Sequence, residues 1–269
     1  MTNESASGLL ARATLERLVR KLQPRYFLSK RWFGSKSKTI VGCVLVDVAV
    51  LQEEPDPLLL VMLKISYAVG EPETYQLPLA FKTRENVPAT IKSQPEGEGV
   101  AGVVETAQGE LWAYDAFAED AFRVALYQSM YDGATFEARS GAVVCQHTPE
   151  GMATREVHTA RHISGEQSNT SIVYNDLFIM KAFRKLWAGR NPDMEAPYYL
   201  TTQRDFRYVP RVAGFIEYRP APGGATAIEN DGGDGEQAMS VAVLQEFVAN
   251  QGDGYTNALG RAHAYFVQA

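Results

Sequence analysis

The sequence has few cysteines and no long apolar run. Its two cysteines, Cys43 and Cys145, lie far apart in otherwise apolar segments, which favours buried reduced thiols over a disulfide framework and fits a reducing cytoplasm. No window of about eighteen residues is apolar throughout, and Met1–Gly8 is small and polar, without a basic start that leads into an apolar core. We therefore predict a protein that is neither embedded in a membrane nor exported.

Positive charge is also scarce. The chain has 26 lysines and arginines against 32 aspartates and glutamates, which gives a net charge of -6. It has no basic run with interleaved aromatic residues, the pattern that suits a nucleic-acid backbone. Nucleic acid is therefore not an expected partner.

Common catalytic and metal-binding motifs are missing as well. The sequence has no nucleophile elbow around a serine, no CxxC pair and no GxGxxG dinucleotide motif. The histidines have no Cys, Asp or Glu neighbour at a metal-ligand spacing, so we expect structural or surface roles for His147, His158, His162 and His263.

The composition is that of a folded globular protein. With 269 residues, of which 45% are hydrophobic and 22% charged, the chain can bury a core and form two or so domains. Helical periodicity covers Arg12–Leu22 and stops at a proline. Alternating or apolar runs beginning at Ile40, together with Leu58–Tyr67 and Thr74–Thr83, predict an antiparallel meander. The polar stretch Lys92–Gly102 is a candidate boundary or exposed loop.

A second unit is expected after this stretch. Turn chemistry predicts a hairpin from Val103–Thr106 and Glu110–Tyr114, and helical spacing follows over Asp115–Tyr131. The remaining patterns are interpreted as strands at Ala134–Thr148 and Arg155–Ile163, a strand pair within Val209–Arg219, and a glycine-rich polar loop at Pro220–Gln237.

The most informative stretch runs from Ser164 to Ala182. It predicts a small polar turn, a strand Asn169–Tyr174, a two-residue turn at Asn175-Asp176 and a second strand Leu177–Phe183 that carries Lys181 among apolar residues. Glycine and serine let backbone N–H groups approach an anion, and a lysine from the next strand adds a point charge, so this pattern indicates a phosphate-binding turn. An ordinary antiparallel hairpin with a solvated lysine gives the same pattern.

Two downstream segments favour the phosphate-binding interpretation. Asn191-Pro192-Asp193-Met194-Glu195 is typical of a helix start, with an asparagine cap, a proline at the first position and acidic residues in the first turn. Glu195 is then placed to pair with Lys181, as in kinase-like ATP sites. Pro197 lies inside this helix, where it would kink the helix or move its start, and this puts the pairing in doubt. The apolar strand Val241–Val248 leads into a polar segment whose backbone is suited to meet an adenine ring.

Large aromatic residues alternate with cations in Arg25–Lys38, ahead of a glycine turn. Cation–π packing onto a core is one interpretation of this segment, and contact with a sugar or phosphate is the other.

Taken together, these blocks resemble bacterial maltokinases, or equivalently the kinase part of trehalose synthase–maltokinase fusions. Five blocks carry the resemblance in the same order: Arg31-Trp32-Phe33-Gly34-Ser35-Lys36, Gly165-Glu166-Gln167-Ser168-Asn169-Thr170-Ser171, Lys181-Ala182-Phe183-Arg184, Asn191-Pro192-Asp193-Met194-Glu195 and Leu244–Gly254. The resemblance implies an α+β fold in which an antiparallel-sheet cap domain is followed by a protein-kinase-like, aminoglycoside-phosphotransferase-like N-lobe. It also implies that the C-terminal helical lobe is truncated at Ala269, within its first helix.

The implied reaction is ATP-dependent phosphorylation of maltose to maltose 1-phosphate, which feeds α-glucan and glycogen synthesis from trehalose in the cytoplasm. The resemblance gives nucleotide-binding roles to the backbone around Ser168, Asn169 and Thr170, to Lys181 held by Glu195, and to an adenine-contacting segment of Gln245, Glu246, Phe247 and Val248. The catalytic base and the Mg²⁺ ligands belong to a His-Gly-Asp-type loop and a later Asp motif that this sequence does not contain, so the chain alone is expected to be inactive. Trehalose synthase is a further expected partner.

The predicted domains are a cap over residues 1–100, an intermediate and ATP-binding N-lobe over 101–248, and a hinge with the start of the C-lobe over 249–269. The cap is expected to act as a lid or docking element outside the nucleotide site. Two alternatives stay open: a kinase of the same fold with another small hydroxylated acceptor, and a non-catalytic nucleotide-binding or regulatory module.

Overall fold

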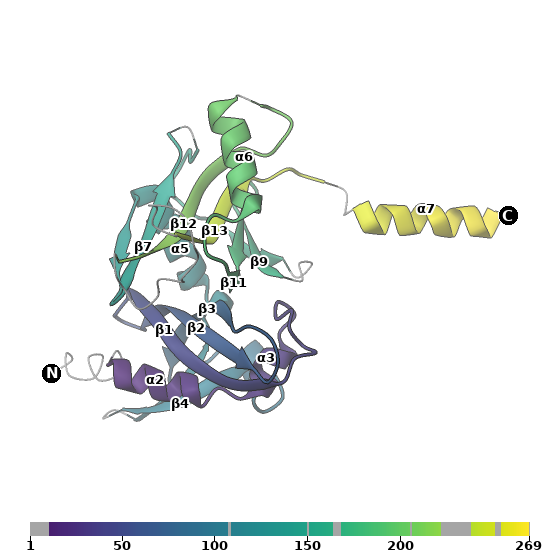
Figure 1. Ribbon diagram of the computed structural model, residues 1–269. Coiled ribbons are helices and arrows are strands. Elements are labelled where there is room, and N and C mark those ends of the chain that lie inside the picture. The colour runs from purple at the N-terminus through teal and green to yellow at the C-terminus, as the bar shows by residue number, and fades with distance from the viewer. Residues whose placement is uncertain are drawn as a thin grey trace.

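The structure is a computed structural model that describes residues 11–106, 109–149, 151–163, 168–204, 206–221, 238–250 and 254–268. Two β-sheets of antiparallel strand pairs dominate it, and few helices accompany them (Figure 1). This mixture of antiparallel sheets and flanking helices confirms the predicted α+β class.

The first sheet, sheet A, has the strand order β1-β2-β3-β5-β4, and β11 pairs with β3 beside this path. Its strands are β1 (Ile40–Gln52), β2 (Leu58–Tyr67), β3 (Glu73–Lys82), β4 (Val100–Thr106), β5 (Gly109–Asp115) and β11 (Lys185–Leu186). The predicted meander is therefore confirmed, and the predicted hairpin extends it as β4 and β5.

The second sheet, sheet B, has the strand order β6-β7-β12-β13-β10-β9-β8. Its strands are β6 (Thr135–Glu137), β7 (Gly141–His147), β8 (Ala160–Ile163), β9 (Asn169–Tyr174), β10 (Phe178–Phe183), β12 (Val212–Pro220) and β13 (Met239–Glu246). The lysine-bearing strand β10 lies between β9 and β13, inside the sheet.

The helices are α2 (Arg12–Arg20), α3 (Pro24–Ser29), α4 (Ala89–Lys92), α5 (Asp120–Asp132), α6 (Pro192–Gln203) and α7 (Gly254–Gln268), with a 3₁₀ turn η1 (Ala116–Ala118) before α5. Figure 1 shows α2 and α3 beside sheet A and α6 beside sheet B, with α7 extending away from both. Within the described residues, no helix has the length and apolar character needed to cross a membrane.

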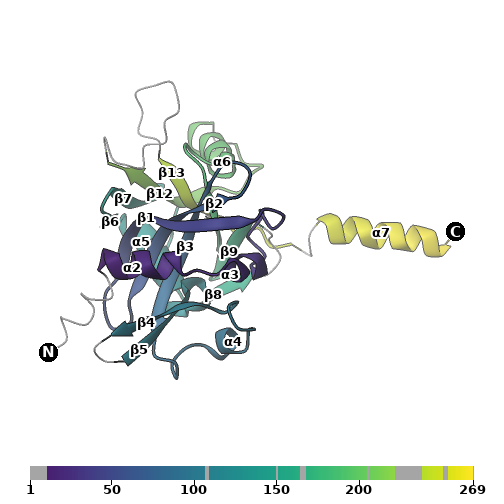
Figure 2. The same cartoon turned by 60° about the horizontal axis from the view of Figure 1, so that its bottom comes forward.

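Strand β2 shows how the layers hold together, because it is apolar on both faces. Leu58, Leu60 and Met62 belong to a core that also contains residues of α5 and sheet B. The alternate residues Leu59 and Val61 belong to a second core with α2 and α3. Sheet A thus lies between its own helices and a core that it shares with sheet B. Figure 2 shows α2 beside β1 of sheet A.

A third, smaller core lies between sheet B and α6. Phe183, Val212, Phe215 and Val243 from the sheet meet Met194 from the helix there. This contact fixes α6 on the face of sheet B that lies opposite the shared core.

Several predicted elements differ from the observed ones. The helix predicted over Arg12–Leu22 ends at Arg20, and Pro24 starts α3 at its first position, where a proline needs no amide partner. Ala134–Thr148 forms two short strands, β6 and β7, and Val209–Arg219 contains one strand, β12, because that segment pairs with β7 and β13 instead of folding back on itself. In the predicted loop Pro220–Gln237, residues 222–237 lie outside the described part of the chain.

The division of the chain into domains at residue 100 stays a prediction. Strands β4 and β5, which follow that residue, pair with each other, and β5 pairs with β3 in sheet A. The expected boundary stretch Lys92–Gly102 runs from the end of α4 into β4, so part of it is strand.

Both cysteines are buried and free, which confirms the expected reduced thiols. Cys43 lies in the core with α2 and α3, and Cys145 lies in the shared core. Burial raises the pKa of each thiol to about 12, so neither is poised for nucleophilic chemistry.

Candidate functional site

The hairpin of β9 and β10 forms as the sequence predicts. Asn169 pairs with Phe183 and Tyr174 with Phe178, and the turn residues Asn175 and Asp176 have φ angles of 53° and 52°. These left-handed angles are those of a type I′ hairpin turn, which matches the right-handed twist of the strands. The polar turn before β9 includes residues 164–167, which lie outside the described residues.

Lys181 lies in the middle of this hairpin with free hydrogen-bonding capacity around it. Its cross-strand neighbours are Ser171 on β9 and Val243 on β13. The lysine is half-buried and forms no hydrogen bond or ion pair with any described residue. The hydroxyl of Ser171 is buried and also has no hydrogen-bond partner. Two unpaired polar groups thus lie side by side on one face of sheet B.

The three residues of the predicted phosphate turn that are described have different surroundings. Ser168 is exposed and Asn169 is half-buried, whereas Thr170 is only 3% exposed. The Thr170 hydroxyl accepts a hydrogen bond from Arg184, and Thr170 pairs with Ala182, so its side chain points to the face opposite Lys181. Only the backbone of Thr170 is available for a ligand on the lysine side.

Helix α6 begins where the sequence predicts. Asn191 is the N-cap, its side-chain oxygen accepts a hydrogen bond from the amide of Asp193 at 2.9 Å, and Pro192 is the first helical residue. The helix continues through Pro197 to Gln203. Thus Pro197 neither ends the helix nor delays its start.

The expected ion pair between Lys181 and Glu195 is not formed. Glu195 is exposed, while its neighbour Met194 is fully buried against Phe183 and Val243. The helical phase therefore turns a thioether toward the lysine strand and the carboxylate toward solvent. Burial of Met194 against Phe183 and Val243 stabilises the fold more than a partly exposed ion pair would, because such pairs contribute little to stability.

The predicted adenine-contacting segment straddles the end of β13. Gln245 pairs with both Ile179 and Val212 inside the sheet, and it is only 6% exposed. The amide of Glu246 donates to Arg211, and that of Phe247 donates to Leu177, so both are already used. Val248 follows with a side chain 59% exposed. The amides of Glu246 and Phe247 are thus not available to a ligand.

The Lys181 face has the chemistry to hold an anionic group. An unpaired ammonium beside an unpaired hydroxyl suits phosphate oxygens, which accept hydrogen bonds and carry negative charge. Within the described part of the chain, no three His, Cys, Asp or Glu residues gather in a way that could hold a metal ion.

Arg184, three residues after Lys181, is a buried residue that sequence analysis assigned no role. Its side chain is 2% exposed and lies between the rings of Trp32 and Phe117, with Cζ at 4.8 and 4.5 Å from their centroids. Nε donates to Thr170 and Nη2 to Asp115, each at 2.7 Å. The structural role of Arg184 follows from partners that are distant in the sequence, so no local sequence pattern predicts it.

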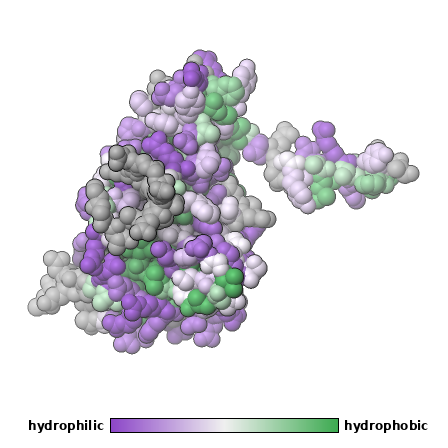
Figure 3. All heavy atoms as spheres, viewed as in Figure 1, coloured by the Kyte–Doolittle hydropathy of each residue, from purple (hydrophilic) through white to green (hydrophobic). Residues whose placement is uncertain are grey.

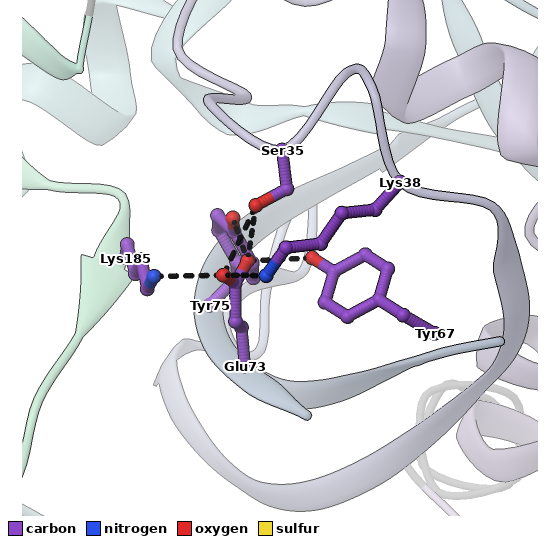
Figure 4. Close-up of polar contacts among 6 residues, drawn as sticks. All are labelled: Ser35, Lys38, Tyr67, Glu73, Tyr75 and Lys185. Atoms are coloured by element: carbon purple, nitrogen blue, oxygen red, sulfur yellow. Dashed lines mark hydrogen bonds and ion pairs between the residues drawn. The ribbon is translucent and has the colours of Figure 1, made fainter. Parts of the chain in front are cut away.

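A second polar cluster surrounds Glu73 at the start of β3 (Figure 4). The Glu73 carboxylate is 9% exposed and accepts hydrogen bonds at 2.6 to 3.0 Å from Ser35, Lys38, Tyr67, Tyr75 and Lys185. Burial alone would raise the pKa of this carboxyl, but hydrogen bonds from two tyrosines and two lysines outweigh burial and hold the pKa well below its usual range. Burial and the bond to Glu73 raise the pKa of Tyr67 to about 12.

Two further buried side chains join the sheets. The Gln76 side chain donates to the carbonyls of Phe183 and Val241 at 2.8 and 2.7 Å, and its amide donates to Arg184. On β1, the buried Asp47 carboxylate accepts hydrogen bonds from the amides of Arg139 and Ser140 and from the hydroxyl of Tyr218. Together with Arg184, these residues make the contact between the two sheets rich in buried hydrogen bonds, and Glu73 adds a bond to Lys185, which follows the Lys181 hairpin in the chain.

In the aromatic and cationic segment Arg25–Lys38, the large aromatic residues Trp32 and Phe33 are buried in this contact. Trp32 is 9% exposed and Phe33 is fully buried, and they pack against each other and against Tyr75. Packing is thus the correct interpretation of these two aromatics.

Comparison with known families supports a relationship for this part of the chain. Residues 26–119 match the family model of the maltokinase N-terminal cap domain. This range contains most of α3, together with β1 to β5, α4 and η1, and most of the Trp32 and Glu73 contacts. The match ends before α5 and the Lys181 hairpin. Residues 26–119 are thus similar to a maltokinase N-terminal cap domain, and for this part of the chain the match supports a relationship to the maltokinase family.

Proposed function

We propose that this chain provides the cap and the nucleotide-binding lobe of a maltokinase, an enzyme that phosphorylates maltose to maltose 1-phosphate with ATP. The observation that carries the proposal is the unpaired Lys181 on β10, a strand of the sheet that shares a core with the maltokinase-type cap. A related kinase with a different small hydroxylated acceptor would share this architecture, because fold does not fix the substrate.

The topology of sheet B supports the proposal. Five of its strands run in the order β8-β9-β10-β13-β12, and α6 follows β10 in the chain. In protein kinases, the loop that covers the phosphates comes first, the phosphate-binding lysine lies on the third strand, and a helix with a glutamate follows. Counting from β8, Lys181 lies on the third strand and Glu195 on the next helix.

Each residue has a proposed role in binding. Lys181 contacts the phosphates, the backbone around Ser168, Asn169 and Thr170 covers them, and the segment from Gln245 to Val248 meets the adenine, chiefly through Val248. When bound, ATP supplies the phosphoryl group and Mg²⁺ neutralises its charge. The residues of this chain bind and orient the nucleotide, and positioning of this kind carries much of the rate in phosphoryl transfer.

Glu195 has no part in the proposed nucleotide site, because α6 buries Met194 against sheet B and leaves Glu195 exposed.

The wider setting follows the family resemblance. It comprises cytoplasmic synthesis of α-glucans such as glycogen from trehalose, with trehalose synthase as a partner.

Nucleotide binding by the chain tests the proposal. We expect Mg²⁺-ATP to bind to the wild-type protein in isothermal titration calorimetry, and we expect Lys181→Met to weaken this binding about tenfold or more while the far-UV circular dichroism stays unchanged. The matched control is Lys64→Met, which removes an exposed lysine from strand β2 of sheet A.

Two results would count against the proposal. Equal nucleotide affinity in the folded Lys181→Met variant would make this lysine an ordinary surface residue. Absence of any nucleotide binding by the wild type would favour a module with a different ligand.

A further inference from the structure

We propose that Arg184 is a positioning residue that makes the cap a working part of the nucleotide site, by holding the strand that carries Lys181 against the cap. The inference rests on the proposed function and assigns a task to a residue that contacts neither the nucleotide-binding face nor solvent. It replaces the expectation that the cap lies functionally outside the nucleotide site.

The guanidinium of Arg184 joins two parts of the chain. On the cap side it pairs with Asp115 at the end of β5 and lies over the ring of Trp32. On the other side it donates to the hydroxyl of Thr170 on β9. Both polar contacts are short, and the planar fork of an arginine fixes their mutual orientation.

Burial makes this contact specific. Arg184 is 2% exposed and Asp115 has a side chain 13% exposed, so separating them would leave an uncompensated charge in the interior. The Nη1 atom is itself buried without a partner, so the guanidinium holds its place although one of its donors is unsatisfied. Because Arg184 is buried and bound on both sides, it restricts the position of β9 relative to the cap.

The backbone carries this geometry to Lys181. The carbonyl of Arg184 accepts from the amide of Gln76 at 2.8 Å, and the carbonyl of Phe183 accepts from the Gln76 side chain. The C-terminal end of β10 is therefore anchored to β3 of the cap by its backbone, and the Arg184 side chain ties it to Asp115 at the end of β5. Lys181 and Arg184 point to opposite faces, because Thr170 pairs with Ala182, which follows Lys181. Arg184 acts on the lysine only through the strand that both residues share.

Thr170 gives the cap a second route to the site. Its backbone belongs to the segment proposed to cover the phosphates, while its side chain is held by Arg184. Loss of the Arg184 contact should loosen the end of β9 that adjoins the phosphate turn as well as the end of β10. The cap thereby sets the spacing between the turn and the lysine.

The experiment compares Arg184→Met and Thr170→Val with the control Arg155→Met, in the complete chain. Arg155 is paired with Asp132 at an exposed site, so the control removes the same charge away from the cap. Thr170→Val removes only the hydroxyl and preserves the shape of a β-branched side chain, so it tests the contact if Arg184→Met fails to fold. Two quantities are measured: amide hydrogen exchange of β9 and β10 without nucleotide, and the Kd of Mg²⁺-ATP.

We expect faster exchange in β9 and β10 and about tenfold weaker ATP binding in both variants, with neither change in the control. ATP binding that depends on Lys181 but stays unchanged in folded Arg184→Met and Thr170→Val would overturn this inference alone. Unchanged exchange in both variants would overturn it as well. Failure of the wild-type chain to bind ATP would overturn the proposed function and this inference with it.

Discussion

At the scale of single residues, the buried carboxylate of Glu73 ties three segments together. It joins the turn at Ser35 and Lys38, the strand β3 on which it lies, and Lys185 of β11. Hydrogen bonds to a charged group are stronger than those between neutral groups, so this one side chain contributes strongly to holding the cap segments and β11 together.

Replacing Glu73 by glutamine should lower the free energy of unfolding by about 3 kcal/mol at neutral pH, because it leaves Lys38 and Lys185 with no anionic partner. Chemical denaturation measures this change. The control Glu16→Gln, in an i,i+4 ion pair on α2, should cost no more than about 0.5 kcal/mol. Similar values for the two variants would show that the Glu73 cluster adds no special stability.

The same carboxylate predicts a pH dependence. Its folded-state pKa is depressed below the ordinary value of 4.5, so its contribution to stability is complete above about pH 4.5 and is lost as the pH falls from there toward the folded-state pKa. We expect the wild type to lose stability over this acidic range more steeply than Glu73→Gln. Parallel stability profiles of the two proteins between neutral and acidic pH would contradict the assignment.

Local residue patterns predicted some of the site and could not predict the rest. Asn175 and Asp176 specify a tight turn, and Asn191 with Pro192 specifies a helix start, because each acts on backbone within two residues of itself. The roles of Arg184 and Glu73 depend on partners distant in the chain, such as Asp115 for Arg184. Local sequence patterns cannot predict such contacts, because the partner residues lie far apart in the sequence.

At the scale of elements, α6 illustrates where sequence reasoning reaches its limit. Its existence and its N-cap follow from Asn191 and Pro192, but its rotational phase is decided by the packing of Met194 against Phe183 and Val243. Both Met194 and Glu195 are compatible with a helix, and only the surface of sheet B selects which one is buried. The predicted contact of Glu195 with Lys181 failed for this reason.

Pro197 should reduce the stability of α6 without breaking it. A proline at this interior position removes the hydrogen bond to the carbonyl of Asp193 and crowds the preceding turn. We expect Pro197→Ala to raise the free energy of unfolding by about 1 to 3 kcal/mol, as measured by thermal or chemical denaturation. The matched control is Pro192→Ala at the first helical position, which should have little effect or a small destabilising one. A destabilised Pro197→Ala variant would contradict this assessment.

At the scale of the whole molecule, the shared core makes the two sheets interdependent. Leu58, Leu60 and Met62 of the cap meet Tyr174, Met180 and Leu244 of sheet B in one cluster. Deletion of the cap at residue 100 would expose this apolar surface, so a deletion variant is a poor test of what the cap does. Point substitutions, such as those at Arg184, test it more sharply.

Helix α7 contrasts with the core, because its apolar residues Leu259 and Phe266 are exposed (Figure 3).

Leu60→Ala should destabilise both sheets together. The side chain is 1% exposed within the shared core, and such truncations cost about 2 to 5 kcal/mol. We expect one denaturation transition, with the same midpoint from tryptophan fluorescence and from far-UV circular dichroism, shifted to lower denaturant in the variant. Val103→Ala, at a site 47% exposed on β4, is the control and should shift it little. Two separate transitions, of which only one moves, would show that the sheets unfold independently.

The hydrogen bonds of Gln76 bear on how the chain reaches this structure. Its side chain binds Val241, 165 residues away, and Asp47 binds Tyr218 at a separation of 171. During synthesis, these buried polar groups of sheet A must therefore wait for 165 and 171 further residues before their partners in sheet B exist. Closure of such long loops slows folding and leaves strand surfaces open to aggregation. Heterologous production of this protein should accordingly benefit from slow translation or chaperone co-expression, and amides of β2 and β13 should gain protection in the same late step of refolding.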